Sequence, residues 1–148
     1  MPDLLQLAER VRQHIPLTRH LDFRLQQFAA DQLVLSAPLA PNINDKGTMF
    51  AGSQAALMAL AGWCLTTLQA ELQLPAADVL ALQNSLRYQR PVTGELTIIA
   101  TTPAQSLAQF RQRLARGERA VLEVAAEGLN ADGSVASIYQ AQYMARVM

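Results

Sequence analysis

The pattern of hydrophobic and polar positions sets one long segment apart from the rest of the chain. No acidic or basic side chain occurs between Lys46 and Glu71, and the segment from about Gly52 to Gln73 predicts a long helix that ends ahead of Pro75. A helix without a polar face is either buried in a protein or inserted in a membrane. This apolar run contains Ser, Gln, Gly and Thr and is shorter than the roughly 20 strongly apolar residues of a membrane span. We therefore predict a buried central helix.

The segments on either side of this helix predict strands and two short helices. Alternation of apolar and polar residues indicates strands, and apolar residues three or four positions apart indicate helices. The predicted helices occupy about residues 4–15 and 103–116, and the predicted strands lie near residues 23–27, 33–37, 78–90, 95–102, 120–129 and 135–145. Turns are expected near residues 30–31, 91–94, 117 and 130–133. Thr102 is the expected N-cap of the second short helix, followed by Pro103.

In the strand near residues 78–90, alternation places apolar residues on one face and polar residues on the other. The apolar face is expected to hold Leu80, Leu82, Leu86 and Tyr88, and the polar face Gln83, Ser85, Arg87 and Gln89. Short turns or helices without crossovers join the predicted strands, so an antiparallel sheet is expected. Residues 1–148 therefore predict a single α+β domain in which an antiparallel sheet wraps around a long central helix.

Composition limits the partners and the location. Hydrophobic residues make up 51% of the chain and charged residues 16%, and twelve basic residues balance twelve acidic ones. This balance gives no electrostatic reason to expect nucleic acid or an anionic membrane surface as a partner. The high apolar content favours a second subunit that covers part of the surface. Charged residues interrupt the first fifteen positions, which therefore do not form a secretory signal and favour a cytoplasmic protein.

Cys64, the only cysteine, lies within the predicted central helix. A single thiol forms no intramolecular disulfide, and the chain has no Cys/His cluster that would bind zinc, so neither a metal nor a cofactor is expected. His14 and His20 are distant from Cys64 in the sequence. We therefore interpret Cys64 as a core residue instead of a nucleophile, and both histidines as structural or surface residues.

The turn before the central helix and the start of that helix resemble a known family. Residues 44–53 read N-x-x-G-T-x-F-A-G-S, and residues 57–63 read L-x-x-L-A-G-W. These motifs resemble the hot-dog thioesterases, and more narrowly the group related to the C-terminal domain of YiiD. Residues 86–96, L-R-Y-Q-R-P-V-x-G-E-L, and 132–136, D-G-S-V-A, resemble the same group. The resemblance extends from about Pro16 to the end of the chain.

The resemblance implies a hot-dog fold and an acyl thioester as the ligand, carried by coenzyme A or by an acyl carrier protein. It also implies a homodimer or a dimer of dimers, with sites at the subunit interface. No metal or cofactor takes part in the chemistry that it implies.

The backbone at the start of the central helix suits thioester hydrolysis. Attack of water on a thioester carbonyl produces an oxyanion, which preorganised backbone N–H groups stabilise. The first turn of a helix offers such unpaired groups at the positive end of its dipole. Ala51, Gly52 and Ser53 occupy this turn, and the missing side chain of Gly52 allows close approach. The apolar helix behind them would provide a wall for an acyl chain.

The candidate catalytic residues are Asn44, Asp45 and Gly52, and the candidate substrate contacts are Thr48, Phe50, Ala51, Ser53, Arg87 and Arg90. Arg87 and Arg90, near the end of a predicted strand, could contact a coenzyme A phosphate or pair with surface acids instead. Ser53 could equally cap the helix, and Gly52 could be only a turn residue. The arginines between residues 111 and 119 fit a solvated face better than a second phosphate site.

The chain departs from the broader thioesterase pattern at two places. Many relatives have His-Gly-Gly where this chain has Phe50-Ala51-Gly52, and an acidic helix residue where this chain has Ala59. The usual general base or nucleophile is therefore absent from its usual position.

Other residues could replace that base. Asn44 could orient the attacking water, and the neighbouring Asp45 is the nearest carboxylate in sequence, although it could also cap the loop. Glu123 and Glu127 share a predicted strand face and could approach the site from elsewhere.

Three functions stay open at this point. The first is an acyl-thioester hydrolase that uses an oxyanion hole and an oriented water. The second is a non-catalytic dimer that binds an acyl thioester, and the third is a structural partner that keeps the fold for dimerisation. A hot-dog dehydratase is disfavoured because its pair of a histidine and an acid cannot be assembled from these residues. The sequence specifies neither the acyl length nor the carrier.

Overall fold

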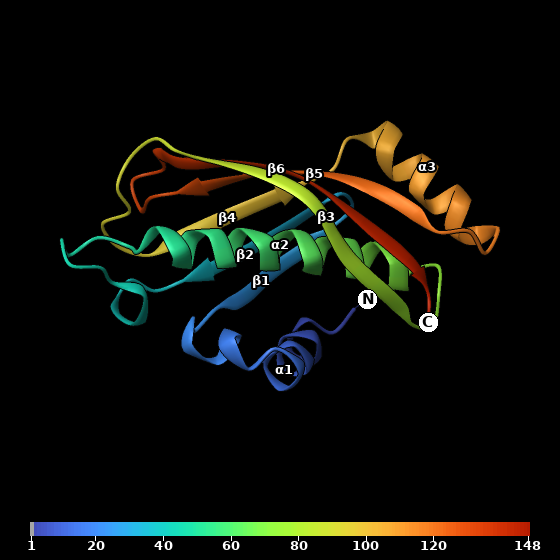
Figure 1. Cartoon of the computed structure of the whole chain (residues 1–148), viewed down its shortest axis with the longest axis horizontal. Coiled ribbons are helices and arrows are strands. Elements are labelled where there is room, and N and C mark those ends of the chain that lie inside the picture. The colour runs from blue at the N-terminus through green and yellow to red at the C-terminus, as the bar shows by residue number, and fades with distance from the viewer. Residues whose placement is uncertain (1) are drawn as a thin grey trace.

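The computed structural model describes residues 2–148, in which six antiparallel strands form one sheet in the order β1-β2-β4-β5-β6-β3. The strands are β1 (Arg24–Ala29), β2 (Gln32–Ala37), β3 (Ala77–Tyr88), β4 (Leu96–Thr101), β5 (Ala120–Leu129) and β6 (Val135–Val147). The helices are α1 (Leu4–His14), α2 (Ala51–Glu71) and α3 (Ala104–Ala115), with short 3-10 turns at Pro16–His20 and Ala40–Asn42. The sheet curls around α2 (Figure 1). This arrangement is the α+β hot-dog fold, as the sequence predicted.

The absence of a polar face on α2 follows from its position inside the curled sheet. Thirteen of its 21 residues are buried. Tyr143 of β6 faces the helix and donates its hydroxyl to the carbonyl of Ala59 (2.8 Å), while the Tyr139 hydroxyl lies 2.7 Å from that of Tyr143. A β-carbon on Gly62 would overlap the Tyr143 ring, so glycine is required for this close contact. The buried hydroxyls thus find partners, which removes most of the cost of burying them.

The other two helices cover different parts of the sheet. α3 packs against β5 and buries Leu107, Phe110 and Leu114 there (Figure 1). The predicted N-cap of α3 is wrong, because Pro103 occupies that position with extended backbone and Thr102 lies one residue too early. The Thr102 backbone N–H donates to the carbonyl of Asp31 (3.3 Å).

None of the helices described between residues 2 and 148 is long and apolar enough to cross a membrane.

β3 is an edge strand, and its side chains do not alternate regularly between the two faces of the sheet along its whole length. Its register against β6 shifts after Ala81, and Leu82 is the extra residue of a β-bulge. Leu80 lies opposite Met144 on the outer face, whereas Leu86 faces α2. The predicted common face for Leu80 and Leu86 is therefore wrong, because the bulge reverses the phase of the alternation.

Candidate functional site at the N-terminal end of α2

Three loops converge at the N-terminal end of α2. The loop of residues 43–49 is joined to the connection after β3, because the backbone N–H of Met49 donates to the carbonyl of Val92 (2.9 Å). The turn between β5 and β6 reaches the same connection, where Asn130 Nδ2 donates to the carbonyl of Pro91 (3.1 Å). Figure 1 shows these loops gathered at one end of the molecule. Segments far apart in the sequence therefore surround the first turn of α2.

Asn44 organises the loop of residues 43–49. Its Oδ1 accepts from the backbone N–H groups of Lys46 (2.9 Å) and Thr48 (3.0 Å), and its Nδ2 donates to the Thr48 hydroxyl (2.9 Å). Gly47 closes the turn with a φ of 80°, which favours glycine. The second N–H of the Asn44 amide has no acceptor within residues 2–148. The amide thus holds the loop and keeps one donor for a ligand or a water molecule.

The first turn of α2 presents unpaired backbone donors. The helix begins at Ala51, and Phe50 is the N-cap residue without a side-chain cap. Ser53 is the third helical residue, so its interpretation as the cap is wrong. In the described part of the chain, the N–H groups of Ala51, Gly52 and Ser53 have no hydrogen-bond acceptor. Three donors at the positive end of a long helix therefore face the loops.

Phe50 lies over this turn. A β-carbon on Gly52 would overlap the ring of Phe50, whose side chain is 56% exposed. The ring therefore occupies the space that the missing side chain leaves, and its exposure gives it room to move outward. Access to the Gly52 backbone depends on both residues.

Tyr88 was not predicted to take part in this site. Its hydroxyl donates to the carbonyl of Ala51 (2.9 Å), so the end of β3 is fixed against the first turn of α2. The side chain is 47% exposed although it faces the helix. The sequence signal for this contact was an aromatic residue with a polar hydroxyl near the end of a predicted strand.

Gln54 is a second residue of this turn that the sequence did not single out. It is buried on the helix, and its Oε1 atom has no partner within residues 2–148. The hydroxyl of Ser137 on β6 is also buried without a partner in that range. Gln54 was visible in the sequence as a polar residue within an apolar helix, but the missing partner of its Oε1 atom could not be inferred.

The candidate carboxylates do not converge on the first turn of α2. Asp45 has an 82% exposed side chain and pairs with Lys46 (3.2 Å). Glu123 and Glu127 share one face of β5, as predicted, but that face points away from α2. Glu123 accepts from Gln142 Nε2 there (2.7 Å). Within one chain, Asp45 is therefore the only one of these three on the loop side of the helix.

The two candidate phosphate-binding arginines lie on exposed segments beside the loops. Arg87 precedes Tyr88 on β3 and points to the opposite face of the sheet, because successive side chains alternate. Arg90 lies in the connection after β3. It helps to hold the pKa of Asp132 below its usual value, a shift caused chiefly by hydrogen bonds from Ser134. Arg90 is therefore near the turn of residues 130–134.

Cys64 lies deep in the core and is completely buried. Burial raises the pKa of its thiol from 9.0 to about 12. A thiol that stays protonated is a poor nucleophile. The interpretation of Cys64 as a core residue is confirmed.

The curled sheet, the central helix and the loop-bordered helix terminus define a hot-dog protein of the thioesterase type. A family model described as "Putative thioesterase (yiiD_Cterm)" matches residues 4–147, and the chain belongs to this family. Membership supports a thioesterase-like function and confirms the family resemblance inferred from the motifs.

Solved structures agree with this assignment. A "putative thioesterase" from Shewanella oneidensis is 30% identical with a TM-score of 0.86, over 98% of this chain and 97% of that chain. A protein of unknown function from Chlorobaculum tepidum is 25% identical with a TM-score of 0.82, over 97% of this chain and 93% of that one. A thioesterase from Haemophilus influenzae is 17% identical with a TM-score of 0.75, over 98% and 91%, and shows similarity of fold.

Proposed function

We propose that this protein is a cytoplasmic acyl-thioester hydrolase that acts on acyl-coenzyme A or an acyl carrier protein thioester. The observation that carries the proposal is the set of unpaired N–H groups on Ala51, Gly52 and Ser53. These donors would stabilise the oxyanion that forms when water attacks the thioester carbonyl. Family membership supports the same reaction type.

Asn44 is the proposed water-orienting residue. Two backbone N–H groups hold its Oδ1, so the direction of the remaining Nδ2 donor is fixed. This donor can position a water or the thioester oxygen, but it cannot remove a proton. Asp45 is the proposed proton acceptor, since it is the adjacent carboxylate on the same loop.

The acyl chain is proposed to lie along the uncovered side of α2. Ala55 is exposed, and Ala59 and Trp63 are partly exposed one and two turns further along. Residues four apart lie on one face of a helix, so these three form a continuous apolar strip. The strip starts next to the proposed oxyanion donors, so an acyl chain whose thioester lies at those donors could extend along it.

A homodimer, or a dimer of dimers, would complete the site. Among the described strands, β3 pairs only with β6, and its other edge carries Leu80 (40% exposed) and Leu82 (50% exposed). A long edge strand with exposed leucines is a pairing surface that proteins usually cover. A two-fold partner along β3 would bring a second set of side chains toward the strip on α2. Arg87 and Arg90 are the proposed contacts of the carrier phosphates at this boundary.

A second candidate function is a dimer that binds acyl thioesters without hydrolysing them. Two observations favour it: Ala59 and Phe50 supply no proton acceptor, and Asp45 is exposed and paired with Lys46. An assay of thiol release from acyl-coenzyme A of short, medium and long chain, alongside direct binding titrations, separates the two functions. A hydrolase releases thiol at a rate proportional to protein concentration. A binder shows saturable binding and no release above the uncatalysed rate.

A further inference from the structure

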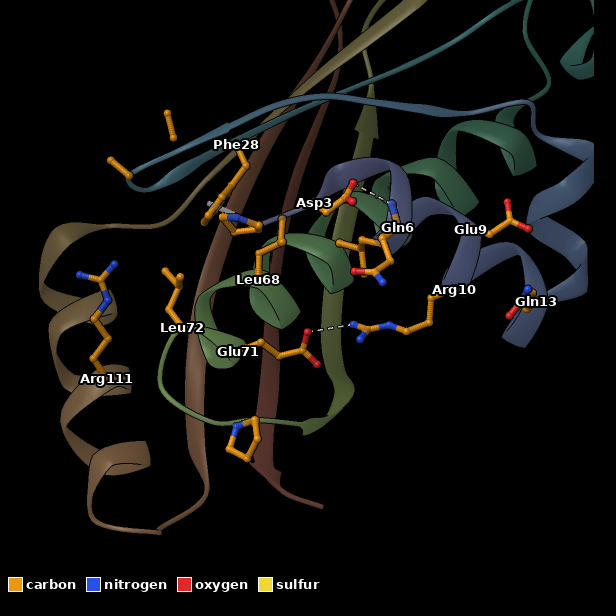
Figure 2. A pocket seen from close by; sticks show the side chains of 15 residues that line it. Asp3, Gln6, Glu9, Arg10, Gln13, Phe28, Leu68, Glu71, Leu72 and Arg111 are labelled. Carbon is orange, nitrogen blue, oxygen red and sulfur yellow. Dashed lines mark hydrogen bonds and ion pairs between the residues drawn. The ribbon is translucent and has the colours of Figure 1, made fainter.

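A cavity of about 1110 Å³ lies at the opposite end of α2 from the proposed thioester site. Residues of α1, the β1–β2 turn, the end of α2 and one residue of α3 line it. Figure 2 shows Arg111 of α3 on one side of this cavity and the residues of α1 on the other. The function proposed above does not use this distal cavity. A ligand could bind here whether or not the protein hydrolyses thioesters.

A hydrogen-bonded chain fixes Arg111 at one end of the distal cavity. Its Nη2 donates to Oε1 of Gln69 (3.1 Å), and Gln69 Nε2 donates to the carbonyl of Ala30 (2.6 Å). Gln69 is completely buried, so it anchors the guanidinium to the interior. A guanidinium has five N–H donors, and within residues 2–148 only one of them has an acceptor.

Arg111 has no acidic partner. Within residues 2–148 no carboxylate forms an ion pair with it, and its buried Nε atom has no acceptor. A buried donor without an acceptor is unfavourable, so the protein compensates the guanidinium only in part. The positioned, unpaired cation therefore favours an anionic group in this end of the cavity.

The floor of the distal cavity is apolar. Leu7, Phe28 and Leu68 are nearly or completely buried there, and Leu72 is half exposed between Arg111 and Glu71 (Figure 2). Leu72 offers most of the apolar surface for an alkyl chain next to the guanidinium. Its volume of about 1110 Å³ slightly exceeds the roughly 300–1,000 Å³ of typical small-ligand sites.

The acidic residues around the cavity lie on the α1 side and at the end of α2, and most are already engaged. Glu71 pairs with Arg10 (3.0 Å), and Asp3 accepts from the backbone N–H of Gln6 as the N-cap of α1 (3.1 Å). Glu9 also lines the cavity, and its side chain is exposed on α1. Among the lining residues that the structure describes, Arg111 is the one cation without an acidic partner, and acids lie across the cavity, so a singly charged head group fits better than a phosphate.

We propose that the distal cavity binds an amphipathic monocarboxylate, with its carboxylate on Arg111 and its alkyl chain over Phe28, Leu68 and Leu72. Recognition needs both parts, because a lone exposed cation gives little affinity and the apolar floor alone does not select the head group.

Calorimetric titration of the intact protein with decanoate and with methyl decanoate tests this site. The two probes share the alkyl chain and differ in the charge that Arg111 would bind. Decanoate should bind the parent more tightly, and Arg111→Gln should weaken decanoate at least about tenfold while leaving methyl decanoate unchanged. Arg113→Gln is the matched control on the same helix, because Arg113 pairs with Glu118 and does not line the cavity. It should change neither affinity.

A second variant keeps the test decisive if Arg111→Gln does not fold. Leu72→Glu adds a carboxylate to a half-exposed position beside Arg111, and it should weaken decanoate more than methyl decanoate, which loses only the apolar contact with Leu72. Equal binding of the two probes by the parent, or no binding of either, would overturn the proposal. So would unchanged decanoate affinity in folded Arg111→Gln and Leu72→Glu, which would leave Arg111 as a structural tether of α3. Gly52→Val changes the other end of α2 and should not affect decanoate binding. The decanoate proposal and the thioesterase proposal can therefore fail independently.

Discussion

The ring of Phe50 occupies the position that a β-carbon on Gly52 would take, at the one turn of α2 with three unpaired N–H donors. The relationship between Tyr143 and Gly62 is similar in geometry but lies in the core. The exposed Phe50 ring can move, whereas the buried Tyr143 ring cannot.

These two glycines should therefore respond differently to the same substitution. Gly52→Ala should leave the free energy of unfolding within about 1 kcal/mol of the parent, because the gain in helix propensity offsets the displacement of an exposed ring. Gly62→Ala should lose about 1–3 kcal/mol through overpacking against Tyr143. Denaturant unfolding of both variants measures the difference. Equal stability of the two variants would contradict the packing described for Gly62.

Asn44 variants separate loop structure from water orientation. Asn44→Ala removes all the side-chain bonds and should reduce turnover on the order of 100-fold, with a smaller change in substrate affinity. Asn44→Asp keeps oxygen acceptors for Lys46 and Thr48 but lacks the N–H donor. Steady-state kinetics should show a loss of turnover in both variants.

Amide hydrogen exchange at Lys46 and Thr48 provides the control for these variants. Exchange should quicken in Asn44→Ala and stay near the parental rate in Asn44→Asp, because only the alanine variant loses the acceptor. Parental turnover in Asn44→Asp would show that the Asn44 donor does not act in catalysis.

Cys64 should affect stability only at high pH. Its folded pKa of about 12 lies above the ordinary value of 9.0, so the unfolded chain loses the thiol proton first as pH rises. The contribution of Cys64 is complete below about pH 9 and falls by about 1.4 kcal/mol per pH unit between the two values. The difference in unfolding free energy between the parent and Cys64→Ala should follow this slope from pH 9 to 10.5. A pH-independent difference would show that the thiol is not desolvated.

The exposed edge of β3 should mediate assembly. The parent should have the mass of at least two 16.2 kDa chains in light scattering, and Leu82→Lys should shift it toward the monomer. Leu17→Lys is the matched control, because Leu17 is 64% exposed but lies on a 3-10 turn away from the edge. A stable monomer of the parent at micromolar concentration would rule the dimer out.

Most of the architecture could be predicted from local patterns. The uncharged segment after Lys46 predicted a buried helix, and the turn near Ala30-Asp31 is present, with Ala30 at a φ of 53°. The Gly117 turn that ends α3 was also confirmed. Each of these depends on residues close in the sequence, where periodicity and turn chemistry are informative.

The features that the sequence did not reveal depend on register and on contacts between distant segments. The bulge at Leu82 reversed the face of Leu80 without any glycine or proline to signal it. The bond from Tyr88 to Ala51 joins residues 37 positions apart, and alternation alone could not reveal it. The candidate site is thus predicted at the level of its loop and helix terminus, while its supporting residues required the structure.

The most direct test of the central claim, hydrolysis at the N-terminal turn of α2, is kcat/KM of Gly52→Val on the parent's preferred acyl-coenzyme A. A valine side chain there would displace the Phe50 ring and block approach to the backbone donors, so kcat/KM should fall on the order of 100-fold or more while the protein stays folded. Phe50→Ala removes the ring without filling the space and should retain most of the activity. A folded Gly52→Val variant with parental kcat/KM would contradict the account, as would a parent that binds acyl-coenzyme A but releases no thiol.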